Sequence, residues 1–178
     1  ARRARWPGVP GAMMRIFFVG SHTAGKSTLA QWVSRRWHMG YLTEVARTEL
    51  AKLETDFDTL RLDVDLASKY QANVFTAQLE AEQAFETRGE SFVADRGFDN
   101  AAYMAKNAVG VSSLLASEEY KAYIQRLRLD CQEGLAFVFF VRPLPLDPRS
   151  NDGRRASTDL NAADIHSVDG MIQLLLEM

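Results

Sequence analysis

Glycine, lysine and hydroxyl side chains near the start of the chain have the types and spacing of a phosphate-binding loop. The nine residues are Gly20, Ser21, His22, Thr23, Ala24, Gly25, Lys26, Ser27 and Thr28, in the pattern G-x-x-x-x-G-K-[ST]. Gly20 and Gly25 let the backbone wrap around a polyphosphate, so that successive N–H groups point inward at the start of a helix. Lys26 then reaches the β- and γ-phosphates, and the Ser27 hydroxyl binds Mg²⁺. The loop predicts a nucleoside triphosphate ligand, taken here as ATP with Mg²⁺; the alternative is a glycine turn without a ligand.

Asp95 ends an apolar run, residues 91–95, and Arg96 follows it directly. An aspartate at a strand end beside a phosphate loop can bind Mg²⁺ or accept a proton from an attacking hydroxyl. The arginine can form a two-pronged contact with a phosphate. We predict that both are catalytic; the alternative is that Asp95 only caps a helix starting near Asn100. Asn100 and Tyr103 are predicted to contact the substrate.

Glu44 and Arg47 stand three residues apart at the end of an amphipathic run, residues 40–45. Glu44 could deprotonate a sugar hydroxyl, which makes it a second candidate for the catalytic base. Arg47 could orient the substrate or neutralise its phosphate. The alternative is a surface ion pair of little energetic value.

Arginines are also found in an irregular stretch of about residues 143–160 that contains Pro, Asp, Asn and Gly. Long irregular stretches in compact domains are typical of lids. Arginines that close over a transferring phosphate stabilise its developing charge. Of Arg142, Arg149, Arg154 and Arg155, we predict Arg154 to be catalytic and Arg142 to contact the substrate. A solvated basic loop is the alternative.

Short apolar runs alternate with helical patterns along the chain. The runs are residues 15–20, 40–45, 91–95 and 135–142. Apolar residues at helical spacing predict a long helix over 63–88 and further helices around 120–131 and 165–176. This alternation predicts a three-layer α/β/α fold with a mostly parallel sheet. Ligands of such sheets bind at the carboxyl ends of the strands, where the candidate residues lie.

Two details of packing follow from the same patterns. The run 40–45 is more amphipathic than the others, so we expect it nearer a sheet edge. Trp32 and Trp37 follow the phosphate loop at helical spacing, so we expect both in the core.

Length and composition favour one domain. A chain of 178 residues with 47% hydrophobic residues can bury one core but is too short for two ordinary domains. We expect this domain over residues 14–178, after a disordered extension of the first 13 residues; a basic arm that touches nucleic acid is the alternative for that extension. The oligomeric state is left open.

Charge, cysteine content and hydropathy limit the partners. A net charge of -2 gives no overall attraction to nucleic acid, and the single cysteine, Cys131, excludes an internal disulfide and fits a reducing cytoplasm. The longest apolar run, 135–141, is far below the roughly 18 residues that a membrane helix needs. We therefore expect a small substrate and no membrane.

Taken together, four segments resemble the nucleoside and nucleotide kinase branch of the phosphate-loop proteins. They are GSHTAGKST at 20–28, TEVAR at 43–47, ADRGFDNAAY at 94–103 and DGRRASTD at 152–159. Within that branch the chain is most similar to small AAA-type ATPases and kinases like the ribosylnicotinamide kinase domain, many of them encoded by bacterial viruses.

The resemblance implies ATP- and Mg²⁺-dependent phosphoryl transfer to a nucleoside- or nucleotide-like acceptor, with roles for Asp95, Arg96 and Arg154. Two alternatives stay open. One is a kinase of 5-hydroxymethyluracil in DNA, with Arg61, Arg88 and Lys106 in a basic groove leading to Asp95. The other is an ATP-hydrolysing switch without a small acceptor. Such kinases usually continue into a strand that contacts adenine, whereas this sequence stops at Met178, so we expect either a minimal version of the fold or one whose C-terminal strand is missing.

Overall fold

The structure, a computed structural model, describes residues 12–22, 24–43, 45–107, 109–142 and 162–177. In this part of the chain, four parallel strands form a sheet in the order β2-β3-β1-β4. The strands are β1 (Arg15–Val19), β2 (Gly40–Leu42), β3 (Phe92–Asp95) and β4 (Ala136–Phe140). All four expected strands are present, each within the expected run, and the expected α/β fold class is confirmed.

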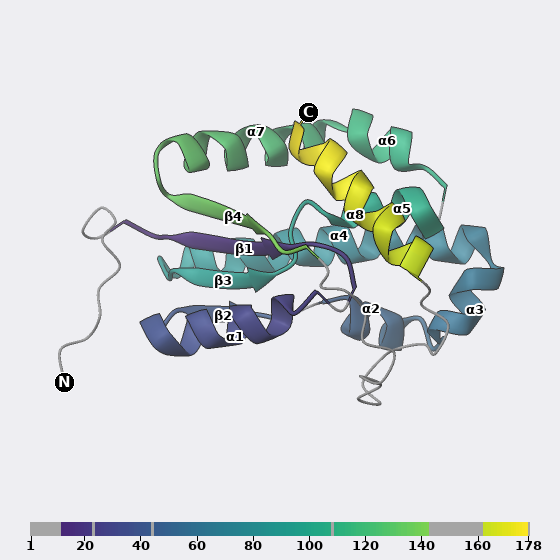
Figure 1. Ribbon diagram of the computed structural model, residues 1–178, viewed down its shortest axis with the longest axis horizontal. Helices are drawn as coiled ribbons and strands as arrows, with labels where there is room; N and C mark the ends of the chain where they lie inside the picture. Colours follow the sequence, from purple (N-terminus) through teal and green to yellow (C-terminus); the bar gives the residue numbers. More distant parts are fainter. Residues whose placement is uncertain (1–11, 23, 44, 108, 143–161, 178) are drawn as a thin grey trace.

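Helices connect the strands and cover the sheet. They are α1 (Lys26–Trp37), α2 (Ala46–Lys52), α3 (Phe57–Leu62), α4 (Val64–Thr87), α5 (Asn100–Asn107), α6 (Val111–Ala116), α7 (Glu118–Gln132) and α8 (Ala162–Glu177). The long helix expected over 63–88 is α4, and it begins where the Asp63 carboxylate accepts a hydrogen bond from the Leu66 N–H at 2.9 Å. Figure 1 shows how these helices lie along the sheet.

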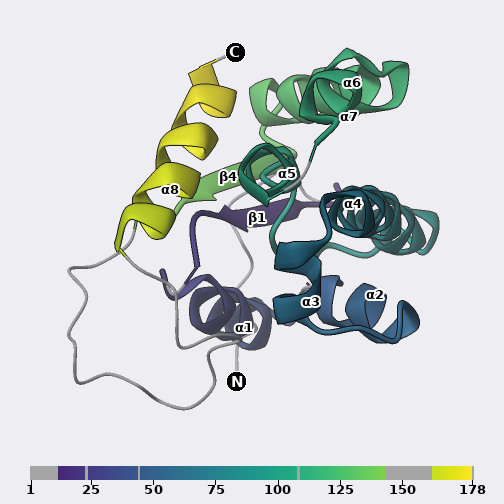
Figure 2. The same ribbon diagram turned by 90° about the vertical axis from the view of Figure 1, so that its right-hand side faces the viewer.

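The two faces of the sheet carry different helices, because strand side chains alternate between faces. On β1, Ile16 and Phe18 pack toward α1, together with Ala30 and Val33 of that helix. Phe17 on the same strand points into the larger core under α4, α5, α7 and α8. Figure 2 shows α1 on one side of the sheet and α4, α5, α7 and α8 on the other.

The expectation that both tryptophans of α1 lie in the core is wrong for Trp32. Its side chain is 57% exposed, and it packs edge-on against Trp37 at a ring separation of 5.4 Å. Ala30 and Val33 are the buried apolar positions of α1, so its inward face is too narrow to include Trp32. Helical spacing identified the stripe but overestimated its width.

The edges of the described sheet follow the expectations in part. β2 lies at one edge, as its amphipathic sequence predicted. β4 lies at the other, and its Phe139 is 43% exposed although it stacks on Phe18. The apolar run therefore placed β4 correctly but overestimated its burial, because β4 has a described neighbour on one side only.

Candidate functional site

The phosphate loop joins the end of β1 to the start of α1. Gly25 takes the left-handed conformation (φ 89°) directly before α1, which explains why glycine stands there. The side chain of Lys26 is buried, and its ammonium group donates a hydrogen bond to the carbonyl of Ser21 at 2.7 Å. Ser27 is exposed at the first turn of α1. The hydroxyl of Ser21 is fully buried and has no hydrogen-bond partner among the described residues.

The pairing of β1 with β3 brings Asp95 beside this loop. Phe18 of β1 is in register with Asp95, so the aspartate lies one residue before the level of Val19 and the loop that follows. Asp95 is buried, and the next residue, Arg96, has a φ of 117°, a conformation that non-glycine residues rarely adopt. The chain therefore turns sharply at Arg96, at the carboxyl end of β3.

The side chain of Arg96 is held inside the protein. Its guanidinium lies over the ring of Tyr103 at 4.1 Å and 4.0 Å from the carboxylate of Asp99. Tyr103 in turn contacts His22 of the phosphate loop edge-to-face, with ring centroids 4.8 Å apart. The first turns of α5 thus connect the Asp95-Arg96 turn to the phosphate loop.

Asp99 is a site residue that the sequence analysis missed. It is completely buried, and its carboxylate accepts hydrogen bonds from the N–H groups of Gly97 at 2.8 Å and Gly20 at 3.5 Å. The signal for it was a second aspartate four residues after Asp95 and directly before a helix, a position typical of aspartates that bond to backbone N–H groups. Nothing in that local signal points to Gly20.

Two further predicted residues lie on α5. The hydroxyl of Tyr103 donates a hydrogen bond to the carbonyl of Gly20 at 2.9 Å. Asn100 is buried, and its amide nitrogen has no hydrogen-bond partner within the described part of the chain. Asn100 therefore keeps a donor for a ligand, whereas the Tyr103 hydroxyl is already bonded to the protein.

The other predicted residues are placed less fully. Arg142 follows β4, is 62% exposed, and pairs with the buried carboxylate of Asp169 on α8 at 2.8 Å. Arg47 lies in α2, but its side chain is not described. Glu44 and Arg154 lie outside the described residues, as do Thr23, Arg149, Arg155 and the expected lid and N-terminal extension. The roles predicted for them stay predictions.

The donors at this end of the sheet fit Mg²⁺. The ion prefers hard oxygen ligands and usually takes only one or two carboxylates from the protein, together with phosphate oxygens and water. Ser27, in the first turn of α1, supplies a hydroxyl, and Asp95, at the end of β3, supplies a carboxylate. The two segments are adjacent because β3 pairs with β1. These two residues are therefore the candidates to hold the metal.

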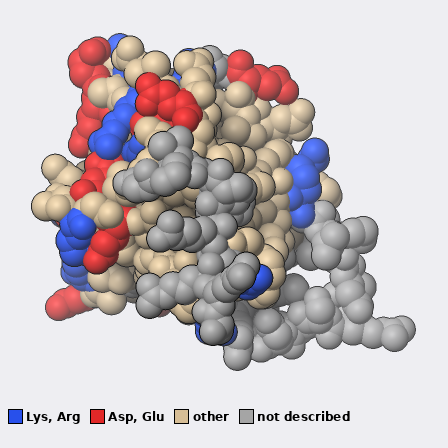
Figure 3. All heavy atoms as spheres, turned by 90° about the vertical axis from the view of Figure 1, so that its left-hand side faces the viewer, with Lys and Arg blue, Asp and Glu red and all other residues tan. Residues whose placement is uncertain are grey.

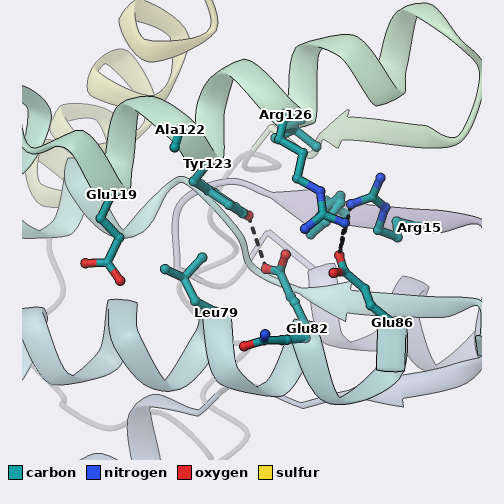
Figure 4. A pocket seen from close by; sticks show the side chains of 11 residues that line it. Arg15, Leu79, Glu82, Glu86, Glu119, Ala122, Tyr123 and Arg126 are labelled. Atoms are coloured by element: carbon teal, nitrogen blue, oxygen red, sulfur yellow. Dashed lines mark hydrogen bonds and ion pairs between the residues drawn. The ribbon is translucent and has the colours of Figure 1, made fainter. Parts of the chain in front are cut away.

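A separate cavity of about 310 Å³ lies between α4 and α7. Glu82 lines it, accepting hydrogen bonds from Gln78 at 2.9 Å and from the Tyr123 hydroxyl at 3.1 Å. Burial raises the pKa of the Glu82 carboxyl to about 7, because these bonds only partly offset the loss of water. Figure 4 shows Glu82 pointing at Tyr123, and Arg126 reaching Glu86 beside Arg15.

This cavity does not include the phosphate loop. Arg15, which lines the cavity, is the first residue of β1, whereas the phosphate loop follows the last residue of that strand. One hydrogen bond on the side toward the loop joins the Gln78 amide to the carbonyl of Arg96 at 3.5 Å. This cavity and the predicted site are thus different places.

The surface at the amino ends of the strands carries mixed charge. In Figure 3, acidic and basic side chains lie next to one another along the left and upper part of this face. Arg88, expected in a basic groove leading to Asp95, precedes β3 and so lies at the opposite end of that strand. It pairs with Glu90 at 2.8 Å. The structure does not bring Arg88 to the candidate site.

No helix among the described residues is both long enough and apolar enough to cross a membrane.

Comparisons with known proteins place the chain among phosphate-loop folds. Residues 15–170 match a family described as "AAA domain". The crystal structure of NadR protein in complex with NR is similar with a TM-score of 0.64 and 19% identity, over 93% of this chain and 43% of that one. The chain thus spans less than half the length of that protein. No curated protein matches it.

Two further solved structures have lower scores. Shikimate kinase from Bacteroides thetaiotaomicron has a TM-score of 0.37 and 17% identity, over 94% of this chain and 100% of that one. Thymidylate kinase from Ehrlichia chaffeensis has a TM-score of 0.41 and 13% identity, also over 94% and 100%. The α/β fold expected from the sequence is confirmed by the match of residues 15–170 to the AAA domain and by the similarity of fold to the NadR structure.

Proposed function

Because the chain belongs to the AAA domain family, we propose that it transfers the γ-phosphoryl group of ATP to a hydroxyl or phosphate of a nucleoside-like acceptor. One observation carries the proposal: the turn containing Asp95 and Arg96 lies beside the phosphate loop and is tied to it through Asp99. A phosphoryl donor and a group that activates an acceptor must lie side by side for in-line transfer. The phosphate loop and the turn at Asp95 and Arg96 lie close enough together for these two roles.

The phosphate loop holds the donor. The backbone N–H groups of the loop after Gly20 and the ammonium of Lys26 bind the ATP phosphates, and the buried Ser21 hydroxyl supplies a further donor. When bound, Mg²⁺ neutralises charge on the phosphates, and Ser27 and Asp95 are the residues that hold it. Lys26 gives up its bond to the Ser21 carbonyl to reach the phosphates.

The carboxyl end of β3 and the segment after β2 hold the acceptor. Asp95 or Glu44 accepts the proton of the attacking hydroxyl, and Arg96 offsets the negative charge that develops on the transferred group. Arg154 closes over the same oxygens from the lid. The buried Asn100 amide donates to the acceptor, with Arg47 and Arg142 as its other contacts.

Ribosylnicotinamide is the first acceptor to test, because the sequence resembles the ribosylnicotinamide kinase domain and the NadR structure is a complex with NR. The assay measures transfer from labelled ATP, in the presence of Mg²⁺, to nucleosides, nucleoside monophosphates, ribosylnicotinamide and DNA containing 5-hydroxymethyluracil. Label on one of the small acceptors supports the proposal. Label on the DNA alone would support the DNA kinase, and ATP hydrolysis without any labelled acceptor would support the switch.

Asp95→Asn tests the role of the turn. We expect transfer to fall about a hundredfold or more, since one positioned acid–base group contributes about that factor. Asp65→Asn is the matched control, because Asp65 is an exposed acid in the first turn of α4. Equal transfer by the two variants would remove Asp95 from the mechanism.

A further inference from the structure

We propose that Tyr103 and Asp99 are positioning residues that hold the phosphate loop in the shape that binds nucleotide. They also join the loop to the turn at residues 95–97, which we call the acceptor turn. The proposal deepens the proposed function and relies on it for the identity of that turn. Neither side chain needs to touch a substrate for this role. Both act through the backbone of Gly20.

Gly20 is held at both of its polar groups. Its carbonyl accepts a 2.9 Å hydrogen bond from the Tyr103 hydroxyl, and its N–H donates a long 3.5 Å hydrogen bond to Asp99. The Tyr103 bond is the stronger of the two, because its length is close to the usual value for such bonds. Tyr103 and Asp99 are 4% and 0% exposed, so water does not replace either contact easily.

The surroundings of Gly20 leave no room for a side chain. A Cβ atom at this position would lie 2.3 Å from the carbonyl oxygen of Val141, at the end of β4. The N–H of Val141 is itself bonded to the carbonyl of Val19 at 2.8 Å. The first residue of the phosphate loop is thus fixed between β4 on one side and α5 on the other.

The same two side chains hold the acceptor turn. The other carboxylate oxygen of Asp99 accepts a 2.8 Å hydrogen bond from the Gly97 N–H, and the ring of Tyr103 supports the Arg96 guanidinium at 4.1 Å. Arg96 has a strained backbone, which persists only where its surroundings fix it. The start of α5 and the residue before it therefore set the position of the phosphate loop relative to Arg96.

Removing the Tyr103 hydroxyl frees a buried carbonyl of the loop. The loop can then relax to bond elsewhere, and the fraction of molecules with a binding-competent loop falls. Apparent nucleotide affinity falls by the same factor. For the loss of one buried hydrogen bond, we expect Kd for Mg-ATP to rise about tenfold.

The test compares two tyrosine-to-phenylalanine variants. Tyr103→Phe removes the bond to Gly20. Tyr70→Phe is the control: Tyr70 is also 4% exposed, and its hydroxyl donates a 3.0 Å hydrogen bond to the carbonyl of Ala46, a residue outside the phosphate loop. Calorimetry measures Kd for Mg-ATP, and hydrogen exchange measures protection of the peptide spanning 15–29. We expect weaker binding and faster exchange in that peptide for Tyr103→Phe only.

Asp99→Asn is the second variant, with folding checked by circular dichroism. Its amide would face an N–H group with another N–H group, so we expect a larger rise in Kd than for Tyr103→Phe. Binding needs no acceptor, so the result counts even where the transfer assay finds none. The proposal is overturned if both variants bind Mg-ATP within twofold of the wild-type protein, or if Tyr70→Phe weakens binding as much as Tyr103→Phe.

Discussion

At the carboxyl ends of the strands, the buried side chains of Asp99 and Tyr103 bond to backbone groups of two loops. At the amino ends, the buried side chain of Arg15 bonds instead to the carboxylates of Glu86 and Asp130. The first set of contacts fixes the path of the main chain. The second set joins β1 to α4 and α7 without shaping a loop.

This difference separates function from stability in one small fold. A phosphate loop binds mainly through backbone N–H groups, so its main chain has to be held precisely. Side-chain pairs between elements contribute to the free energy of unfolding but leave loop geometry unchanged. Variants at the two ends of the sheet should therefore fail in different assays.

The largest expected effect is on transfer. Lys26→Met removes the ammonium proposed to stabilise charge on the transferring phosphate, and we expect phosphoryl transfer to fall about a thousandfold. Steady-state transfer from labelled ATP measures the change. Lys52→Met is the control, because Lys52 is 64% exposed and pairs only with Glu49 among the ion pairs described. A loss of less than tenfold in Lys26→Met would contradict the role given to this residue.

A second effect concerns stability at the other end of the sheet. Arg15→Met leaves the carboxylates of Glu86 and Asp130, 16% and 14% exposed, without their buried partner. We expect the free energy of unfolding to fall by roughly 3 to 5 kcal/mol. Urea denaturation measures it, with nucleotide Kd expected to stay within twofold of the wild-type value.

Arg126→Met is the matched control for that change. Arg126 pairs with Glu86 at 2.8 Å, but its side chain is 55% exposed. Its loss should cost less than about 1 kcal/mol. If Arg15→Met and Arg126→Met cost the same, or if Arg15→Met weakens nucleotide binding, the two ends are not separate in the way described.

The third effect depends on pH. The pKa of Glu82 is raised from 4.5 to about 7, so the folded protein keeps this proton in a range where the unfolded chain releases it. The stability that comes from holding the proton is complete below about pH 4.5 and is lost as pH rises toward 7. The change is at most about 3 kcal/mol.

Glu82→Gln tests this by mimicking the protonated acid. Its amide oxygen can accept the bonds from Gln78 and Tyr123. We expect the variant to gain stability over the wild-type protein between pH 5 and pH 8 in urea denaturation. A parallel pH dependence for the two proteins would show that Glu82 ionises at its ordinary pKa.

Much of the fold could be predicted from local patterns. The long helix α4 follows from its apolar spacing, and Asp63 caps its start by accepting a hydrogen bond from the Leu66 N–H. The strands follow from short apolar runs between helical patterns. Trp32 shows the limit, because helical spacing says which residues share a stripe but not how wide a stripe the sheet will cover.

The candidate site could be predicted only where its residues are neighbours in the sequence. Asp95 was found because it ends an apolar run, but Asp99 was missed. Its contact with Gly20 spans 79 residues, and no spacing encodes a contact of that range. The cavity beside Glu82 could not be predicted for the same reason, because the residues that line it come from α4, α7 and β1, which are far apart in the sequence.

The sequence by itself determined the phosphate loop, because nine consecutive residues contain the glycines, the lysine and the helix start that a phosphate needs. The tertiary structure decided what holds that loop in place. Tyr103 reaches Gly20 across 83 residues only because β3 pairs with β1 and α5 starts beside the end of both strands. Local chemistry specifies what the loop can bind, and strand order specifies which side chains keep it in the shape to do so.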